Sequence, residues 1–302
     1  MADSTYGVGL YAPAGFVIEP AAITRAVARI EALGHRVVVD PTVTTRWQRF
    51  SAPDHERLAA ILRMADDPRV DLAIAVRGGY GWSRLLECVD FKRIAASGKR
   101  WMGHSDFTAF QMAALAQTAM VSFAGPMVAY DFGAESPSAF TLQHCWGLLG
   151  ADRYSVECAL DGPRHVATQG TLWGGNLAMI AHLAGTSFLP RIDGGILFVE
   201  DVGEHPYRVE RMFYQLHFAG ILQRQRAILI GDLSGFELGA NDNGYDAEAM
   251  VSHLRQVFGA PIFTGLPFGH RRDKLTLPVG GQCALEAGGG AARLTFSGYA
   301  NR

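Results

Sequence analysis

The residues Trp101-Met-Gly-His-Ser-Asp-Phe-Thr-Ala-Phe110 follow the pattern of a strand end, a turn and a helix start. Ser105 stands at the junction. A serine there can cap the helix by accepting a backbone N–H, or it can be a nucleophile held on a sharp turn, as in serine hydrolases. The cap is the commoner role, and the G-x-S-x-G pattern is half met, because Gly103 is present but position 107 is Phe. The segment predicts a strand–turn–helix unit and leaves both roles of Ser105 open.

Similar units surround this segment in the first half of the chain. Apolar residues at helical spacing predict helices, and short apolar or β-branched runs predict strands between them. The predicted helices cover 20–33, 55–64 and 108–118, and the predicted strands cover 7–12, 36–40, 71–76, 99–103 and 119–123. Repeated βα units imply a parallel sheet covered by helices.

The alternation weakens after about residue 150, and the last forty positions are rich in Gly and β-branched residues. Strands are expected at 195–199, 227–230 and 261–264, helices at 206–219 and 246–257, and a hairpin loop at 288–290. We therefore predict an α/β fold with two domains. The expected N-terminal domain covers 1–155, a linker covers 156–169, and a smaller mixed β/α domain covers 170–302.

The composition narrows the class of protein. The chain has 302 residues, of which 49% are hydrophobic and 19% charged, and its net charge is −2. Such a charge predicts no nucleic-acid partner and no membrane-surface partner, and no apolar run is long enough to predict a membrane span. The four cysteines are scattered and no secretory signal is visible, which favours the cytoplasm. No metal and no cofactor are expected, because the histidines and cysteines lack metal-ligand spacing.

Two turns are expected to face one crevice. Ligands of open parallel sheets bind at the carboxyl ends of the strands. The strand 71–76 runs into Arg77-Gly-Gly-Tyr-Gly81, and the next strand runs into the turn that carries Ser105. The glycine-rich turn could hold an oxyanion with its backbone N–H groups, or it could be a plain strand-to-helix turn.

A serine nucleophile also needs a base and a group that orients the base. Glu200 follows the apolar strand 195–199, and His270 lies in a Gly/Pro loop after the strand 261–264. Each has a plainer interpretation, as a solvated acid at a strand end and as an exposed loop residue.

Six stretches together resemble the LD-carboxypeptidases, which are murein tetrapeptide carboxypeptidases of the serine-peptidase type. They occur in order over nearly the whole chain, and this makes the match specific. The stretches are Arg77-Gly-Gly-Tyr-Gly81, Gly103-His-Ser-Asp-Phe-Thr108, Gly125-Pro-Met127, Gly170-Thr-Leu-Trp-Gly-Gly-Asn176, Glu200-Asp201 with the following Glu-His-Pro-Tyr-Arg, and Phe268-Gly-His270.

The resemblance implies a flavodoxin-like N-terminal domain, a C-terminal mixed domain and an active site between them. It implies that Ser105 is the nucleophile, Glu200 the acid and His270 the base. The expected oxyanion donors are the backbone N–H of Asp106 and that of Gly79.

A substrate with a free carboxylate calls for a cation in the crevice. The candidate substrate contacts are Arg77, Tyr80, Arg208 and Trp173, and Arg271 is a further candidate cation.

The activity that the resemblance implies is release of terminal D-alanine from murein tetrapeptide in the cytoplasm during peptidoglycan recycling. The expected partner is the muropeptide substrate, with no cofactor, and the expected assembly is a homodimer. Three alternatives stay open. Some family members hydrolyse peptidyl-nucleotide antibiotics in self-immunity, and here Trp173 or Trp82 could stack on the base. The chain could also be a non-catalytic muropeptide-binding protein, or a general esterase of the α/β-hydrolase type.

Overall fold

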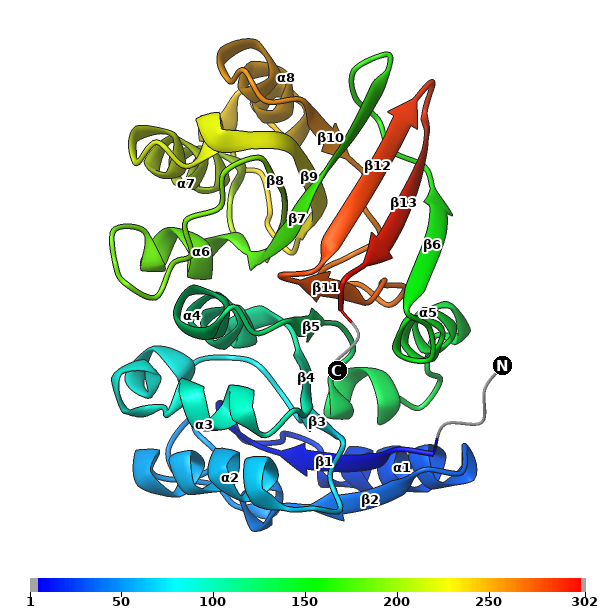
Figure 1. The fold of residues 1–302 in the computed structure, drawn as a ribbon. Coiled ribbons are helices and arrows are strands. Elements are labelled where there is room, and N and C mark those ends of the chain that lie inside the picture. The colour runs from blue at the N-terminus through cyan, green and yellow to red at the C-terminus, as the bar shows by residue number, and fades with distance from the viewer. Residues whose placement is uncertain (1–4, 300–302) are drawn as a thin grey trace.

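The computed structural model describes residues 5–299 and contains two β-sheets, one in each half of the molecule (Figure 1). Helices flank both sheets. No helix of the part described is both long and apolar enough to cross a membrane.

The first sheet has six strands in the order β11-β5-β4-β3-β1-β2. Its strands are β1 (Gly7–Tyr11), β2 (Arg36–Val39), β3 (Leu72–Ala75), β4 (Arg100–Gly103), β5 (Ser122–Ala124) and β11 (Leu277–Val279). The five strands from the N-terminal half are parallel and have the flavodoxin-like order 2-1-3-4-5. The predicted parallel sheet is thereby confirmed.

Helices follow most of these strands, and the apolar spacing predicted those that begin at Pro20, Asp54 and Thr108. They are α1 (Pro20–Ala32), α2 (Asp54–Asp66), α3 (Phe91–Ala96), α4 (Thr108–Thr118) and α5 (Ala139–Leu149). The predicted helix at 108–118 has the bounds of α4. Neither α3 nor α5 was predicted from the sequence. The apolar residues of α5 are spread around most of the helix and give no clear face.

The second sheet has seven strands in the order β10-β9-β8-β7-β12-β13-β6. They are β6 (Arg153–Cys158), β7 (Val166–Asn176), β8 (Gly195–Val202), β9 (Gln225–Ser234), β10 (Ile262–Thr264), β12 (Gln282–Gly288) and β13 (Ala291–Ser297). The strands β10-β9-β8-β7 are parallel, and β7-β12-β13-β6 are antiparallel. The helices α6 (Leu177–Leu183), α7 (Pro206–Phe218) and α8 (Ala247–Val257) belong to this half.

Strand pairing crosses the expected division of the chain into domains. Strand β6 pairs with β13, so residues 153–158 lie in the second sheet. Strand β7 begins at Val166, which leaves only 159–165 between these two strands. Strand β11 pairs antiparallel with β5, so the C-terminal half returns to complete the first sheet. These pairings join residues that are far apart in the sequence, and the polar stretch near 157–165 did not predict them.

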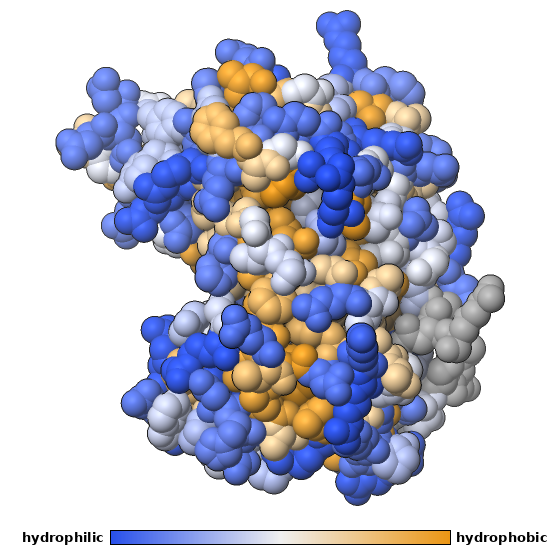
Figure 2. Space-filling model, turned by 60° about the vertical axis from the view of Figure 1, so that its left-hand side comes forward, coloured by the Kyte–Doolittle hydropathy of each residue, from blue (hydrophilic) through white to orange (hydrophobic). Residues whose placement is uncertain are grey.

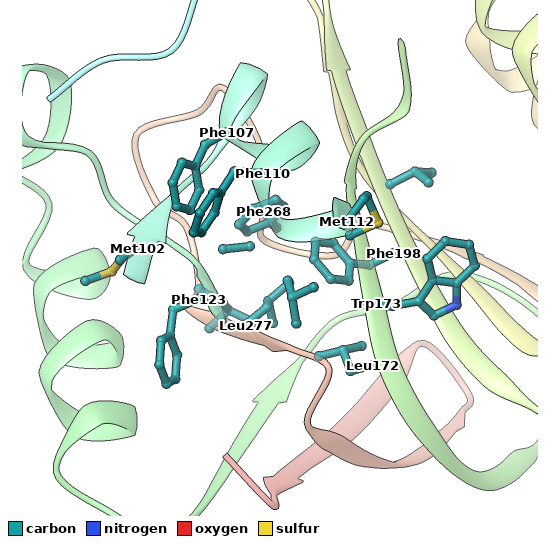
Figure 3. Packing of buried hydrophobic residues seen from close by; sticks show 14 of the residues in the cluster. Met102, Phe107, Phe110, Met112, Phe123, Leu172, Trp173, Phe198, Phe268 and Leu277 are labelled. Carbon is teal, nitrogen blue, oxygen red and sulfur yellow. The ribbon is translucent and has the colours of Figure 1, made fainter. Parts of the chain in front are cut away.

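One continuous hydrophobic core joins the two halves. Figure 3 shows side chains of α4 and β4 close to side chains of the second half. The labelled residues are Met102, Phe107, Phe110, Met112, Phe123, Leu172, Trp173, Phe198, Phe268 and Leu277. On the face shown in Figure 2, hydrophobic residues gather along the middle of the molecule and hydrophilic residues cover both ends. The relative position of the two halves is therefore fixed by packing.

A buried ion pair adds to this junction. Lys274 Nζ, just before β11, lies 2.7 Å from Asp131 Oδ1, which follows β5. Both side chains are buried, and Asp131 Oδ2 also accepts the N–H of Met127 at 2.7 Å. Removing one partner of a buried pair leaves the other charge without compensation.

We expect Lys274→Met to lower the free energy of unfolding by about 3–5 kcal/mol, because Asp131 stays buried without its cation. Urea denaturation followed by circular dichroism measures this change. The matched control is Arg93→Met, because Arg93 pairs with Asp66 in a half-exposed bridge and such bridges contribute less than about 1 kcal/mol. Equal losses in the two variants would contradict the assignment.

Candidate active site

Ser105 lies on a strained turn between β4 and α4. Its φ is +64°, a left-handed conformation that costs a non-glycine residue about 1–3 kcal/mol. Its hydroxyl caps neither the short 3₁₀ turn at Ser105–Phe107 nor α4. The helix-cap interpretation is therefore wrong, and the strain serves to hold the hydroxyl away from the helix.

The turn at Ser105 has Phe107 where the G-x-S-x-G pattern has its second glycine. Contact between Gly103 and Phe107 explains why the turn accepts an aromatic residue there. A Cβ on Gly103 would lie 2.8 Å from the ring of Phe107 and 3.2 Å from Ala75 Cβ. The ring is fully buried and stacks on Phe110 with centroids 4.9 Å apart. Phe107 thus fills the space that the absent side chain of Gly103 leaves.

The structure brings Ser105, His270 and Glu200 together in one hydrogen-bonded array. His270 Nε2 lies 3.0 Å from Ser105 Oγ, and His270 Nδ1 lies 2.7 Å from Glu200 Oε2. Gly269 makes this approach possible, with φ +129° and a Cβ position only 2.7 Å from Asp232 Cβ. Only glycine fits there, so the backbone delivers the imidazole directly over the carboxylate.

Glu200 is fully buried and has a second donor besides His270. Asn176 Nδ2 lies 3.3 Å from Glu200 Oε1 and 3.0 Å from Asp201 Oδ1. The backbone N–H of Asn176 donates to Thr108 Oγ1 at 2.9 Å, which ties the end of β7 to the start of α4. The sequence analysis quoted Asn176 in the Gly-Gly-Asn run but gave it no role; only the fold shows that it bridges the two acids.

The surroundings of His270 and Asp201 shift the pKa values of both side chains. Burial lowers the pKa of His270, but the hydrogen bond and charge of Glu200 outweigh it, and the pKa is raised. Burial and the neighbouring Glu200 raise the pKa of Asp201 to about 6. The paired acid Glu200 therefore supports a protonated imidazole, as the orienting group of a serine nucleophile must.

The glycine turn after β3 packs directly on the nucleophile. A Cβ on Gly78 would lie 2.7 Å from Ser105 Cβ and 2.9 Å from its Oγ. Gly79 has φ +97°, and Gly78 O accepts the N–H of Gly15 at 3.0 Å. Neither the Gly79 N–H nor the Asp106 N–H donates to another group within residues 5–299. Within the described residues both amides are therefore left free to donate to a ligand.

The side chain of Asp106 is hydrogen-bonded to the backbone just after the glycine turn. Its Oδ2 accepts the N–H of Trp82 at 3.0 Å, and the carboxylate is buried. Arg57, also buried, donates to Gly81 O at 3.2 Å and to Pro13 O at 2.6 Å. Burial raises the pKa of Asp106 to about 6. The sequence analysis considered only the amide of Asp106 and missed its carboxylate.

A cleft of about 610 Å³ opens at Ser105 and His270. Its cationic lining residues are Arg77, Arg271, Arg272 and Lys274. His104 lines it as well, with Nδ1 2.9 Å from Gly125 O. Burial and the charge of Lys274 keep its pKa well below the usual value, so His104 is neutral. A larger groove of about 720 Å³ between the end of β9 and α8 contains none of the three aligned residues.

Some of the residues predicted to contact substrate line the cleft, and others lie outside it. Arg77 and Arg271 line the cleft, whereas Tyr80 and Arg208 do not. Arg208 is exposed on α7, 3.8 Å from Glu204. Trp173 is fully buried and donates to Gln225 Oε1 at 2.8 Å. The expected contact of Trp173 with substrate is wrong, because the residue packs in the core of the second half.

Models of one protein family match most of the chain. The LD-carboxypeptidase N-terminal domain matches residues 8–125, and the LD-carboxypeptidase C-terminal domain matches residues 169–285. The chain belongs to the LD-carboxypeptidase family. The membership confirms the resemblance seen in the sequence and makes the chain an enzyme of the carboxypeptidase class.

Individual LD-carboxypeptidase relatives match over nearly the full length. The crystal structure of a muramoyltetrapeptide carboxypeptidase from Oxalobacter formigenes has 47% sequence identity and a TM-score of 0.92, covering 97% of this chain and 99% of that one. A probable murein peptide carboxypeptidase of Bacillus subtilis is 28% identical over 92% of this chain and 88% of its own length. The microcin C7 self-immunity protein MccF of Escherichia coli is 26% identical over 76% of this chain and 75% of its own length. Proteins named as peptidases and an immunity protein thus share this LD-carboxypeptidase fold.

We expect Gly78→Ala to lower kcat/KM by about a hundredfold, because the added methyl displaces Ser105 or the turn and small displacements at a reacting centre cost about that much. The matched control is Gly259→Ala, because a Cβ at Gly259 would meet nothing within 4 Å. Steady-state kinetics with circular dichroism as a folding check measures the effect. Unchanged kinetics in the Gly78 variant would contradict the close packing.

We expect Glu200→Gln to lower the rate by about 10⁴-fold and to move the acid limb of the pH profile. His270 must be neutral to accept the Ser105 proton, so kcat/KM falls as the pH drops through its raised pKa. Without the charge of Glu200, burial lowers that pKa and the limb shifts to lower pH. The control Glu157→Gln removes an exposed acid and should leave the limb in place. If the acid limb of the pH profile does not move in Glu200→Gln, the pKa of a group other than His270 determines it.

Proposed function

We propose that the protein releases terminal D-alanine from murein tetrapeptide by serine catalysis. The observation that carries the proposal is the continuous array from Ser105 Oγ through His270 to Glu200, with contacts of 3.0 and 2.7 Å. It is supported by relatives that are named murein peptide and muramoyltetrapeptide carboxypeptidases. A purely muropeptide-binding protein would need neither the strained serine nor its alignment with a buried acid.

In the proposed reaction, Ser105 Oγ attacks the carbonyl of the third residue while His270 Nε2 accepts its proton. Glu200 orients the imidazole and stabilises its protonated form. The oxyanion is held by the backbone N–H groups of Asp106 and Gly79, and loss of one such donor costs about 10²–10³ in rate. His270 then protonates the amine of D-alanine, which leaves. Water, deprotonated by His270, hydrolyses the acyl-enzyme and frees Ser105.

The carboxylate of D-alanine is assigned to the side of the cleft that carries Arg271 and Arg272. Within residues 5–299, neither guanidinium forms an ion pair or a hydrogen bond. Arg77 Nη1, from another lining residue of the cleft, already donates to Phe16 O at 2.7 Å. A free guanidinium binds a carboxylate with two parallel hydrogen bonds.

A role in nucleotide-antibiotic immunity is a second candidate, because MccF is a relative. The two tryptophans expected to stack on a base do not support it. Trp173 and Trp82 are both buried, with exposed fractions of 0% and 1%. The proposed setting remains the cytoplasm, in peptidoglycan recycling, and the proposed assembly a homodimer.

The decisive experiment incubates the enzyme with murein tripeptide, tetrapeptide and pentapeptide and measures free D-alanine. We expect release from the tetrapeptide, with kcat falling at least about 10³-fold in Ser105→Ala because the nucleophile is lost. The control Ser155→Ala removes an exposed hydroxyl from β6. Retained turnover in Ser105→Ala would reject the nucleophile, and cleavage of an aminoacyl-nucleotide in place of the tetrapeptide would favour the immunity role.

A further inference from the structure

His104 lies between β4 and the nucleophile, and the reaction proposed above gives it no role. Its side chain is buried, with an exposed fraction of 2%, and it lines the cleft. Its ring meets the ring of His270 edge to face, with the two centroids 5.3 Å apart. Because His104 also directly precedes Ser105, a bond that is broken by the triad is broken next to this imidazole.

The hydrogen bond of His104 fixes which ring nitrogen carries the proton. Nδ1 lies 2.9 Å from Gly125 O, and a carbonyl oxygen only accepts, so Nδ1 is the donor. The ring is neutral, because burial and the charge of Lys274 hold its pKa well below the usual value. Nε2 of such an imidazole has a free lone pair and acts as an acceptor. Within residues 5–299, no group donates a hydrogen bond to it.

Few side chains of the cleft can accept a hydrogen bond. The lining arginines have only N–H donors, and both carboxylate oxygens of Asp131 already accept hydrogen bonds. The hydroxyl groups of Tyr130 and Ser136 also line the cleft and can accept. Of these acceptors, His104 is the one in ring contact with His270. A substrate N–H at the triad therefore meets Nε2 of His104.

A peptide bond that is cleaved here brings such an N–H group. The scissile nitrogen carries one hydrogen, and burying that donor without an acceptor costs free energy. Attack by Ser105 converts the amide into a tetrahedral centre, and the nitrogen then has a lone pair that must take the proton from His270. An acceptor that holds the N–H also fixes the direction of this lone pair.

We propose that His104 Nε2 accepts the N–H of the scissile amide and holds it until D-alanine leaves. The inference rests on the proposed function and deepens it, because it assigns a contact to the leaving group. No proton moves to His104. His270 takes the Ser105 proton and gives it to the scissile nitrogen, and the C–N bond then breaks to release the amine. His104 thus positions the substrate and favours an amide over an ester.

The test compares two substrates that differ at one group. One is murein tetrapeptide, and the other has D-lactate in place of D-alanine, so that an ester oxygen replaces the scissile N–H. We expect His104→Asn to lower kcat/KM for the amide about tenfold to a hundredfold, which is the cost of burying a donor without an acceptor. It should leave kcat/KM for the ester unchanged or raised. Asn can still donate to Gly125 O but has no acceptor at the position of Nε2.

Two further variants test the acceptor itself. In His104→Gln the side-chain oxygen reaches the position of Nε2, so part of the amide rate should return. His104→Phe keeps a ring against His270 but has no nitrogen, so it should behave like the Asn variant. The control is His55→Asn, which removes an imidazole with 79% of its side chain exposed and should change neither rate. Circular dichroism checks that each variant is folded.

The outcomes separate this inference from the proposed function. Equal losses for amide and ester in His104→Asn, or no loss for either, would show that His104 only supports the turn. The same conclusion follows if the ester rate falls more than the amide rate. In these cases the inference is overturned and the carboxypeptidase activity stands. If the wild type cleaves neither substrate, the proposed function is wrong and the inference falls with it.

Discussion

The hydrogen bond between His270 Nε2 and Ser105 Oγ, 3.0 Å long, joins groups that are 165 residues apart. One comes from the first sheet and the other from a loop after the last parallel strand of the second. A nucleophile and its base must stay within hydrogen-bond reach, so the two halves cannot be independent bodies. The continuous core, the pairing of β11 with β5 and the buried pair of Lys274 with Asp131 all lie at this junction. The pairing of β11 with β5 also helps to fix His270, because His270 lies only a few residues before β11 in the chain.

Close backbone approach shapes the site as much as side chains do. Gly78 packs on Ser105, and Gly269 packs on Asp232 and Glu200, at distances that leave no room for a Cβ. Ser105 accepts a positive φ that only the surrounding packing can enforce. The buried Phe107 and the bonds from Asp106 and Arg57 to the glycine turn supply this enforcement. The strained serine and the glycines are thus one arrangement, in which the half-buried hydroxyl of Ser105 packs against the glycine turn.

Besides Asp131, three buried carboxylates lie around the triad, and each has different partners. Glu200 pairs with His270, and its charge outweighs the burial that would keep the imidazole neutral. Asp201 shares Asn176 with Glu200 and accepts the N–H of Ala178 at 2.9 Å, which ties it to the start of α6. Asp106 accepts the N–H of Trp82, which directly follows the glycine turn. Burying a carboxylate is costly unless donors surround it. The donors to these three carboxylates are His270, Asn176 and backbone N–H groups.

The sequence by itself determined the local elements and the chemistry of the site. The spacing of apolar residues predicted α1, α4 and α7 to within a residue or two, because amphipathic periodicity is a local property. It predicted β1, β3, β4 and β8 closely, placed β5 a few residues too early and did not predict β7. The motifs around Ser105, Glu200 and His270 pointed to the family. Only the tertiary structure decided that Ser105 caps no helix, that Trp173 is core, and that Asn176 bridges two acids. It also decided that β6 pairs with β13 and that β11 pairs with β5, although the paired strands are far apart in the sequence. Those facts depend on strand pairing and on contacts between distant residues, and no local pattern encodes which strand edge or which cavity a segment will meet.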